Sequence, residues 1–332
     1  MGGHVGLQAG DADVVADFVV RGDVSKRLAR RCYCLGAKQR GSGGMSVTSG
    51  FTHSPIMRVL LFRGTRWCKM VPMPNPSKPC AALGLLALLP LSACAADNQP
   101  EQLVAVVHER YDFDPTSFTQ GLEVGPGGEL YVGTGWNGES RVYRRDINGT
   151  ELASQSLPDE DFGEGISLVD AALWQLTWQS GIAYKRDAQT LEVVDQAAID
   201  GEGWGICHLE ETGEMIFSDG TAQLRRMDPE TLEERERFSV TLAGEPVDGL
   251  NELECVGSDV YANVFTTTDI VRIDAETGNV TAVIDASGVP NNAEPDLNNV
   301  LNGIAHIPGT DEFYVTGKRW PDLYRVTFTP AD

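Results

Sequence analysis

The stretch DFGEGIS, residues 161–167, places a carboxylate between two glycines directly ahead of an apolar run. Variants of this pattern return along the chain with spacings of 44, 40, 47 and 51 residues. The five segments are TQGLEV at Gln120, GEGISL at Glu164, GWGICH at Trp204, LNELEC at Asn251 and LNGIAH at Asn302. A period of about 40 to 50 residues is typical of the blades of a β-propeller.

A short alternating run follows each of these segments and predicts a second strand bounded by turn residues. The runs are ELYVGTG (129–135), ALWQLTW (172–178), EMIFSDG (214–220), DVYANVF (259–265) and EFYVTGK (312–318). Most are followed by a third strand with a polar turn, and helical periodicity is scarce after residue 100. We therefore predict an all-β fold, a five-bladed β-propeller with four-stranded antiparallel blades, over residues 104–328.

One position recurs when the five segments are placed in register, namely the residue before the central glycine, or before Glu252 in the fourth repeat. The first strand of a propeller blade lies nearest the central axis, and glycine lets its backbone approach that crowded axis. The side chain before the glycine would then face the mouth of the channel. Such a convergence is typical of a binding or catalytic site. The expected ring consists of Gln120, Glu164, Trp204, Asn251 and Asn302.

Glu164 is the only ionisable member of this ring. Its expected neighbours Phe162, Trp178 and Trp204 would exclude water and raise the pKa of the carboxyl group, into a range useful for proton transfer. The alternative is a carboxylate that only accepts hydrogen bonds from backbone amides between blades. The nearby Glu252 and Glu254 could likewise complete a polar network or bind a cation.

Other residues could extend this site, and for each of them two roles are open. Lys318 in VTGKRWP could hold a substrate carbonyl or tune Glu164, or it could be an exposed turn lysine. The tryptophans at 136, 178, 204 and 320 suggest a snug apolar pocket for one residue-sized ligand, although propeller cores also use tryptophan for packing. His108, His208 and His306 lack the spacing of a metal triad, so we expect no metal and no cofactor.

The net charge of −22 is unevenly distributed. Residues 1–94 carry 12 Lys and Arg against 4 Asp and Glu, whereas residues 95–332 carry 14 against 44. The acidic part would repel phosphates at long range, which argues against nucleic acid as a partner. It is also long enough for one large domain, which we expect to be a monomer that takes neutral or cationic ligands.

Residues 81–93, AALGLLALLPLSA, form an apolar run that is too short for a mature membrane span and suits the core of a signal peptide. The following LSAC, residues 91–94, resembles the lipobox of bacterial lipoproteins. We therefore predict a lipoprotein-type signal peptide over 70–94 with lipidation at Cys94. A plain secretory signal cut near Ala96 is the alternative.

Either signal predicts an exported domain, periplasmic and lipid-anchored to the outer membrane of a Gram-negative bacterium, or secreted. The anchor at Cys94 would be the chain's one membrane contact. We interpret residues 1–69 as an upstream extension that is not native, or as disordered, residues 95–103 as a linker and residues 329–332 as a tail. Export permits a disulfide between Cys207 and Cys255, but two cysteines do not establish one, and we expect two buried thiols.

Eight ordered motifs resemble those of one family: FTQGL (118–122), FGEGI (162–166), LTW (176–178), GWGI (203–206), SDG (218–220), NELE (251–254), LNGIA (301–305) and VTGKRWPDLY (315–324). The family is that of the bacterial and plant glutaminyl-peptide cyclotransferases, known as glutamine cyclotransferases, and the similarity covers about residues 104–328. It implies a five-bladed propeller that converts the N-terminal glutamine of peptides or proteins to pyroglutamate, with release of ammonia and without zinc.

The resemblance also implies where the functional residues lie. The functional positions of the family correspond here to Phe118, Gln120, Phe162, Glu164, Trp178, Trp204, Asn251 and Lys318. The repeat register adds Asn302. Glu164 would shuttle the proton, and Asn251, Gln120 and Lys318 would hold the γ-amide and stabilise the oxyanion. The aromatic residues would wall the pocket. Two other functions remain open at this point: a calcium-dependent lactonase-like hydrolase, and a non-catalytic periplasmic binding propeller.

Overall fold

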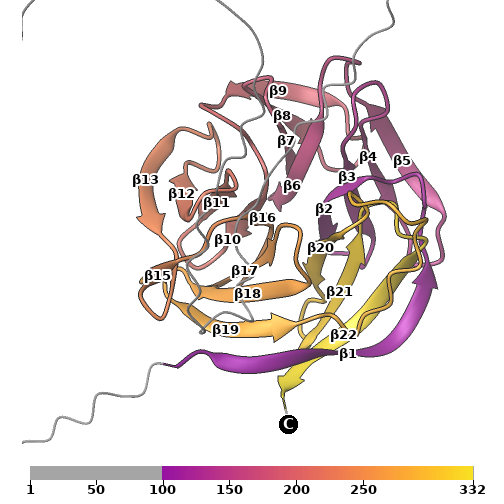
Figure 1. Ribbon diagram of the computed structural model, residues 1–332. Helices are drawn as coiled ribbons and strands as arrows, with labels where there is room; N and C mark the ends of the chain where they lie inside the picture. The colour runs from indigo at the N-terminus through magenta and orange to yellow at the C-terminus, as the bar shows by residue number, and fades with distance from the viewer. Residues whose placement is uncertain (1–98, 332) are drawn as a thin grey trace, which may run out of the picture. The chain divides into compact units, whose positions relative to one another are not determined.

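The computed structural model describes residues 99–331. Every regular secondary-structure element in this range is a β-strand (Figure 1). The predicted signal peptide, Cys94 and the segment 1–69 lie outside these residues. Within the described range no helix is long and apolar enough to cross a membrane.

Three four-stranded antiparallel sheets follow one another along the chain, and in each the strands pair in sequence order. The first contains β2 (Thr119–Val124), β3 (Leu130–Thr134), β4 (Arg141–Arg145) and β5 (Glu151–Ser156). The second contains β6 (Gly163–Val169), β7 (Ala172–Thr177), β8 (Ile182–Asp187) and β9 (Val193–Ala198). The third contains β10 (Ile206–Leu209), β11 (Glu214–Ser218), β12 (Gln223–Met227) and β13 (Glu234–Ser239), and the short pair β14 (Thr241–Leu242) and β15 (Glu245–Pro246) follows it.

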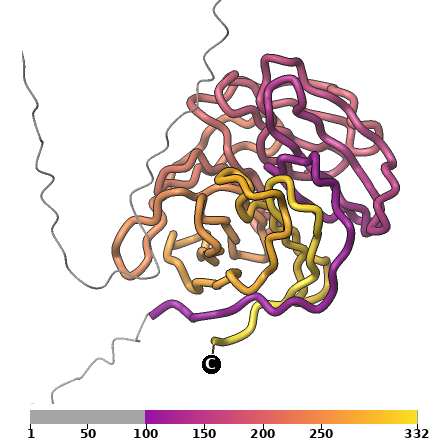
Figure 2. The backbone as a smooth tube through the Cα atoms, turned by 45° about the vertical axis from the view of Figure 1, so that its right-hand side comes forward, coloured from indigo at the N-terminus to yellow at the C-terminus, as the bar shows by residue number. Residues whose placement is uncertain are grey.

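The remaining strands form one eight-stranded sheet in the order β16-β17-β18-β19-β1-β22-β21-β20. Its bounds are β16 (Leu250–Val256), β17 (Asp259–Val264), β18 (Asp269–Asp274), β19 (Val280–Asp285), β1 (Glu101–Asp112), β22 (Asp322–Pro330), β21 (Glu312–Gly317) and β20 (Leu301–His306). Strand β1 pairs antiparallel with β22 and, over Glu101–Val104, parallel with β19. The N-terminal strand therefore completes the C-terminal set of strands, as the tube in Figure 2 also shows.

This pairing moves two expected boundaries. Strand β1 begins at Glu101, inside the segment expected to be a linker, and β22 continues to Pro330, inside the expected tail. The two segments pair with each other, with Leu103 opposite Pro330. The backbone N–H and C=O groups of each strand therefore find hydrogen-bond partners on the other.

The first strands of the repeats lie at the centre of Figure 1, and we call β2, β6, β10, β16 and β20 the inner strands. Each contacts the next in this order, and β20 returns to β2. The glycines that follow the ring position permit this approach. A Cβ atom on Gly121 would lie 2.6 Å from the backbone nitrogen of Ile166, and one on Gly165 would lie 2.7 Å from the carbonyl oxygen of Trp204.

Apolar side chains of neighbouring sheets fill the spaces between them in five clusters. Trp320 belongs to one of these clusters, with 3% of its surface exposed, and its indole donates to the carbonyl of Asn299. Of the two roles considered for Trp320, the structure shows packing in the core, because Gly317 leaves room for the indole to pack inward.

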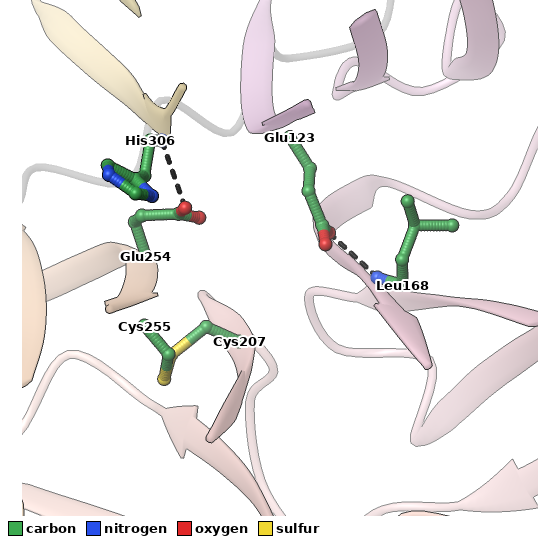
Figure 3. Close-up of a disulfide and its surroundings, with 6 residues drawn as sticks. All are labelled: Glu123, Leu168, Cys207, Glu254, Cys255 and His306. Atoms are coloured by element: carbon green, nitrogen blue, oxygen red, sulfur yellow. Dashed lines mark hydrogen bonds between the residues drawn. A yellow bond between two sulfur atoms is a disulfide. The ribbon is translucent and has the colours of Figure 1, made fainter. Parts of the chain in front are cut away.

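Cys207 and Cys255 form a disulfide, with Cα atoms 5.4 Å apart, so the expectation of two thiols is wrong (Figure 3). The two cysteines lie on the adjacent inner strands β10 and β16. Their separation of 48 residues is one repeat length, and the repeat therefore brings them to neighbouring positions of consecutive inner strands.

Candidate active site

Three members of the expected ring form a chain of hydrogen bonds at the N-terminal ends of their inner strands. The Nδ2 atom of Asn302 donates to Gln120 Oε1 at 3.1 Å, and Gln120 Nε2 donates to Glu164 Oε1 at 3.0 Å. These residues come from β20, β2 and β6 and are separated by up to 182 residues in sequence. All three side chains are buried, so the repeat register correctly predicted a polar cluster on the axis.

Glu164 and Lys318 are two opposite charges enclosed in the same site. Glu164 is 5% exposed, and burial raises the pKa of its carboxyl group well above the usual value. The charge of Lys318 opposes this shift, and that of Glu202 adds to it. Lys318 is 4% exposed, and burial lowers the pKa of its ammonium group to about 8, against the influence of Glu164. Lys318 is therefore a buried site residue and not an exposed turn lysine.

Aromatic side chains surround this polar centre, and we call Phe118, Phe162, Trp178, Trp204 and Phe265 the aromatic collar. Ring centroids are 6.0 Å apart for Phe118 and Phe162, 5.8 Å for Phe162 and Trp178, and 5.4 Å for Trp204 and Phe265. The Nζ atom of Lys318 closes the gap between Phe265 and Phe118, at 4.9 Å from each ring centre.

Glu202 closes the other gap in the collar, between Trp178 and Trp204. Its Oε2 atom accepts hydrogen bonds from the indole nitrogens of Trp178 at 2.8 Å and Trp204 at 3.0 Å. Its Oε1 atom accepts from Gln179 at 2.8 Å. One carboxylate thus fixes the orientation of two tryptophans, and its charge also acts on Glu164. Sequence analysis missed Glu202, although it lies only two residues before the ring position of its repeat.

Phe265 was also missed, although the repeat carried a signal for it. It directly follows the second strand of its repeat, β17, as Trp178 follows β7 and Lys318 follows β21. Trp136 lies beyond β3, with its ring 5.2 Å from that of Phe118, and so stands beside the collar.

The remaining ring members, Asn251 and Trp204, take different places. Trp204 precedes β10, and its carbonyl accepts a hydrogen bond from Gly165 at 2.8 Å while its indole belongs to the collar. Asn251 is buried on β16, and its Oδ1 atom has no hydrogen-bond partner among the described residues. The Oδ1 atom of Asn302 is in the same state. A ligand with amide N–H groups could satisfy such buried acceptors.

Three other carboxylates, the buried Glu252 and the partly buried Glu123 and Glu254, hold inner strands together through backbone amides. Glu252 accepts from Leu122 at 3.2 Å and from Ile304 at 2.8 Å. In the same way Glu254 accepts from His306 at 2.9 Å, and Glu123 accepts from Leu168 at 2.7 Å (Figure 3). Of the two roles considered for Glu252 and Glu254, the structure shows the polar network. Among residues 99–331, no three His, Cys, Asp or Glu are grouped so that they could hold a metal ion.

A cavity of about 610 Å³ lies at the other ends of the inner strands. Its lining includes Glu123, Glu254, the disulfide and two histidines, His208 and His306. Burial raises the pKa of Glu123 to about 8 and that of Glu254 well above its usual value. The two ends of the axis thus differ in composition, since Lys318 and the collar occur only at the Glu164 end of the described chain.

Comparisons with known proteins agree with one another. A family model described as glutamine cyclotransferase matches residues 80–328. A curated glutaminyl-peptide cyclotransferase from Arabidopsis thaliana is 34% identical over 235 residues, which cover 69% of this chain and 72% of the plant protein. The crystal structure of Myxococcus xanthus glutaminyl cyclase is similar with a TM-score of 0.66 and 31% identity, and the match covers 70% of this chain and 100% of that chain.

Proposed function

The chain belongs to the glutamine cyclotransferase family, and from that premise we propose that it cyclises the N-terminal glutamine of peptides or proteins at the Glu164 site. The product is pyroglutamate, and ammonia is released. In this proposal the five inner strands are the first strands of the five blades of a propeller. Strand β1 is the fourth strand of the last blade. The inner strands contact one another in a closed ring, from β2 through β6, β10 and β16 to β20 and back to β2, and this supports the blade count.

The reaction is an intramolecular acyl transfer. The neutral α-amine of the substrate, whose usual pKa is about 8, attacks the carbon of its own γ-carboxamide and forms a tetrahedral intermediate. Glu164 accepts the proton that the amine nitrogen loses and returns it to the γ-nitrogen. The carbon–nitrogen bond to that nitrogen then breaks, ammonia leaves and the five-membered lactam remains. The reaction consumes no water and needs no oxidant or reductant.

Glu164 can take both roles because its environment shifts its pKa upward. A carboxyl group is an effective proton shuttle when its pKa lies near the working pH. Burial supplies that shift, and the nearby Lys318 ammonium limits it, so the carboxylate form stays accessible. Gln120 supports the orientation of the carboxylate, because its side chain is itself held by Asn302.

The other site residues orient the flexible glutamine side chain. The unpartnered oxygens of Asn251 and Asn302 are acceptors for the γ-amide N–H groups, and the Lys318 ammonium can stabilise the developing oxyanion. The collar excludes water and restricts the side chain to conformations in which amine and carbonyl meet. The observation that carries the proposal is the Asn302–Gln120–Glu164 chain, which ends on a buried carboxylate facing a lysine.

The direct test is to incubate the purified protein with a synthetic peptide that begins with glutamine and to follow its mass. Cyclisation removes one ammonia and lowers the mass by about 17 Da, and ammonia should appear in equal amount. A peptide with N-terminal asparagine is the matched control, because its shorter side chain would give a strained four-membered ring. No mass change of the glutamine peptide beyond its spontaneous rate would exclude this function.

We further propose that the domain works outside the cytoplasm. The Cys207–Cys255 disulfide supports this location, because such bonds persist in oxidising compartments. Fractionation of cells that express the full chain, with labelling by a radioactive fatty acid, would test both export and lipidation at Cys94. Unlabelled protein in the cytoplasmic fraction would contradict the proposal.

A further inference from the structure

Two residues at the outer edge of the collar have left-handed backbones and contact each other. Trp136 has φ 106° and Arg319 has φ 57°. The guanidinium carbon of Arg319 lies 4.5 Å from the centre of the Trp136 ring and 5.1 Å from that of Phe118. Positive φ is unfavourable for residues other than glycine, and it persists where the surroundings enforce it, often at functional sites.

Hydrogen bonds fix both backbones, that of Trp136 within its own turn and that of Arg319 to a distant segment. The carbonyl of Trp136 accepts from the amide of Glu139 at 2.9 Å and from the hydroxyl of Ser140 at 2.8 Å. The amide of Arg319 donates to the carbonyl of Ser117 at 2.7 Å. Trp136 follows β3 and Arg319 follows β21, so two different sheets contribute to this contact.

The pair lies outside the buried centre. Trp136 is 37% exposed, whereas Phe118 beneath it is 6% exposed. Arg319 is partly exposed and stacks on two rings, and within residues 99–331 its guanidinium makes no hydrogen bond or ion pair. Stacking fixes the plane of the guanidinium and leaves the N–H groups along its edge available.

We propose that Trp136 and Arg319 form the subsite for the residue that follows the N-terminal glutamine, and that Arg319 binds a carboxylate there. This inference rests on the proposed function, since a substrate whose glutamine reaches Glu164 must continue past the collar. An arginine fork matches the geometry of a carboxylate, and the indole offers an apolar surface for the methylene groups of the same side chain. Across the collar the acidic Glu202 would repel a carboxylate, so the Arg319 side is the one that favours it.

The test compares kcat/KM for three peptides with amidated C-termini, which differ only in Glu, Gln or Lys after the N-terminal glutamine. The expected preference for Glu over Gln is about three- to fivefold at low salt, since a partly exposed ion pair is weak. It should fade at 0.5 M salt, where the Debye length is roughly 4 Å. The dipeptide Gln-Ala as free acid and as amide shows whether a terminal carboxylate is bound as well as a side chain.

Arg319→Gln should abolish the preference, so that the ratio of the Glu to the Gln peptide falls to about one. Arg237→Gln is the matched control, because it changes the net charge equally on the outer strand β13, and it should keep the preference. An equal loss with all three peptides would mean that Arg319 only supports the collar and would overturn the subsite.

The salt dependence of the unaltered protein tests the same claim without any variant. A preference for Glu that persists unchanged at high salt, or no preference at all, would contradict binding by Arg319. Ammonia release without a second-residue preference would overturn this subsite alone, whereas no release from any of the peptides would overturn the proposed function and the subsite with it.

Discussion

The two ends of the central axis both contain glutamate side chains shielded from bulk solvent, fully at Glu164 and partly at Glu123 and Glu254, and the glutamates have different partners at the two ends. At one end Glu164 accepts a hydrogen bond from the side chain of Gln120 and faces the ammonium group of Lys318. Toward the other end Glu123 and Glu254 accept hydrogen bonds from backbone amides of neighbouring inner strands. Burial raises the pKa at both ends.

The difference teaches that burial and a raised pKa do not identify a catalytic carboxylate. A carboxylate that accepts hydrogen bonds from backbone amides joins two strands, and its bonded oxygens stabilise the fold. Glu164 is instead bound by the side chain of Gln120 and balanced by the ammonium group of Lys318, inside a ring of aromatic residues. The partner of the carboxylate therefore indicates its role better than its pKa does, and the following changes test that distinction.

Removal of the disulfide should have the largest effect on stability and none on turnover. The double variant Cys207→Ser and Cys255→Ser releases a link across 48 residues between β10 and β16. We expect the free energy of unfolding to fall by about 3 kcal/mol, measured by urea denaturation. Turnover of a glutamine peptide at 25 °C should not change, because the bond lies at the end of the axis away from Glu164. A clear loss of turnover in variant protein shown to be folded would contradict the inference that the disulfide end of the axis does not contribute to the reaction at Glu164.

Lys318→Met should lower kcat/KM by about 30-fold, since the cation near the developing oxyanion is lost while the packing is kept. The pH dependence should move as well. Because the Lys318 charge lowers the pKa of Glu164, its loss raises that pKa, and the acidic limb of the kcat/KM profile should shift to higher pH. An unchanged limb would show that the rate does not depend on a carboxylate near Lys318.

Glu202→Gln should have a smaller effect, with the opposite shift. Both indoles donate to the same oxygen, and a neutral amide oxygen can still accept from both but more weakly than a carboxylate, so the tryptophans lose part of their anchoring and we expect kcat/KM to fall about fivefold. Removing this negative charge lowers the pKa of Glu164, so the acidic limb should move to lower pH. A shift to higher pH would contradict the electrostatic coupling between the two carboxylates.

Glu123→Gln should have the smallest effect, on the pH dependence of stability. The pKa of Glu123 is raised to about 8 in the folded protein, whereas an unfolded glutamate titrates near its ordinary value of about 4.3. Its stabilising contribution is therefore complete below about pH 4.3 and is lost as the pH rises through about 8. Because Glu123 is partly exposed and solvent screens its charge, the variant should be more stable than the unaltered protein at pH 9 by only about 1 kcal/mol and similar at pH 4, as thermal unfolding would reveal. Equal pH profiles would show that Glu123 is ionised freely in the folded state.

The repeat pattern was sufficient to predict the inner strands and the cluster at Gln120, Glu164 and Asn302, because the same strand position recurs in each repeat. Phe162 and Lys318 were also singled out from the sequence, and the resemblance to a family added Phe118. The disulfide was predicted wrongly, although its cysteines stand one repeat apart, because composition alone was weighed.

Other features depend on packing that no local pattern contains. Trp320 and Trp136 each follow the second strand of a repeat closely, yet one packs into the core and the other lies beside the collar. Glu202 acquires its role only when two tryptophans from different repeats meet at one oxygen. Such contacts require the relative placement of the sheets, which the spacing of the repeats does not specify.

The most direct measurement of the central claim is the turnover of one glutamine peptide by Glu164→Gln and Glu123→Gln side by side, with circular dichroism to establish that both are folded. Each variant replaces a carboxylate of raised pKa with an amide of nearly the same shape, one at each end of the axis. We predict that Glu164→Gln lowers kcat by about 10³-fold, as expected for loss of a proton shuttle, while Glu123→Gln keeps the rate of the unaltered protein. Equal rates for the two variants would contradict the account.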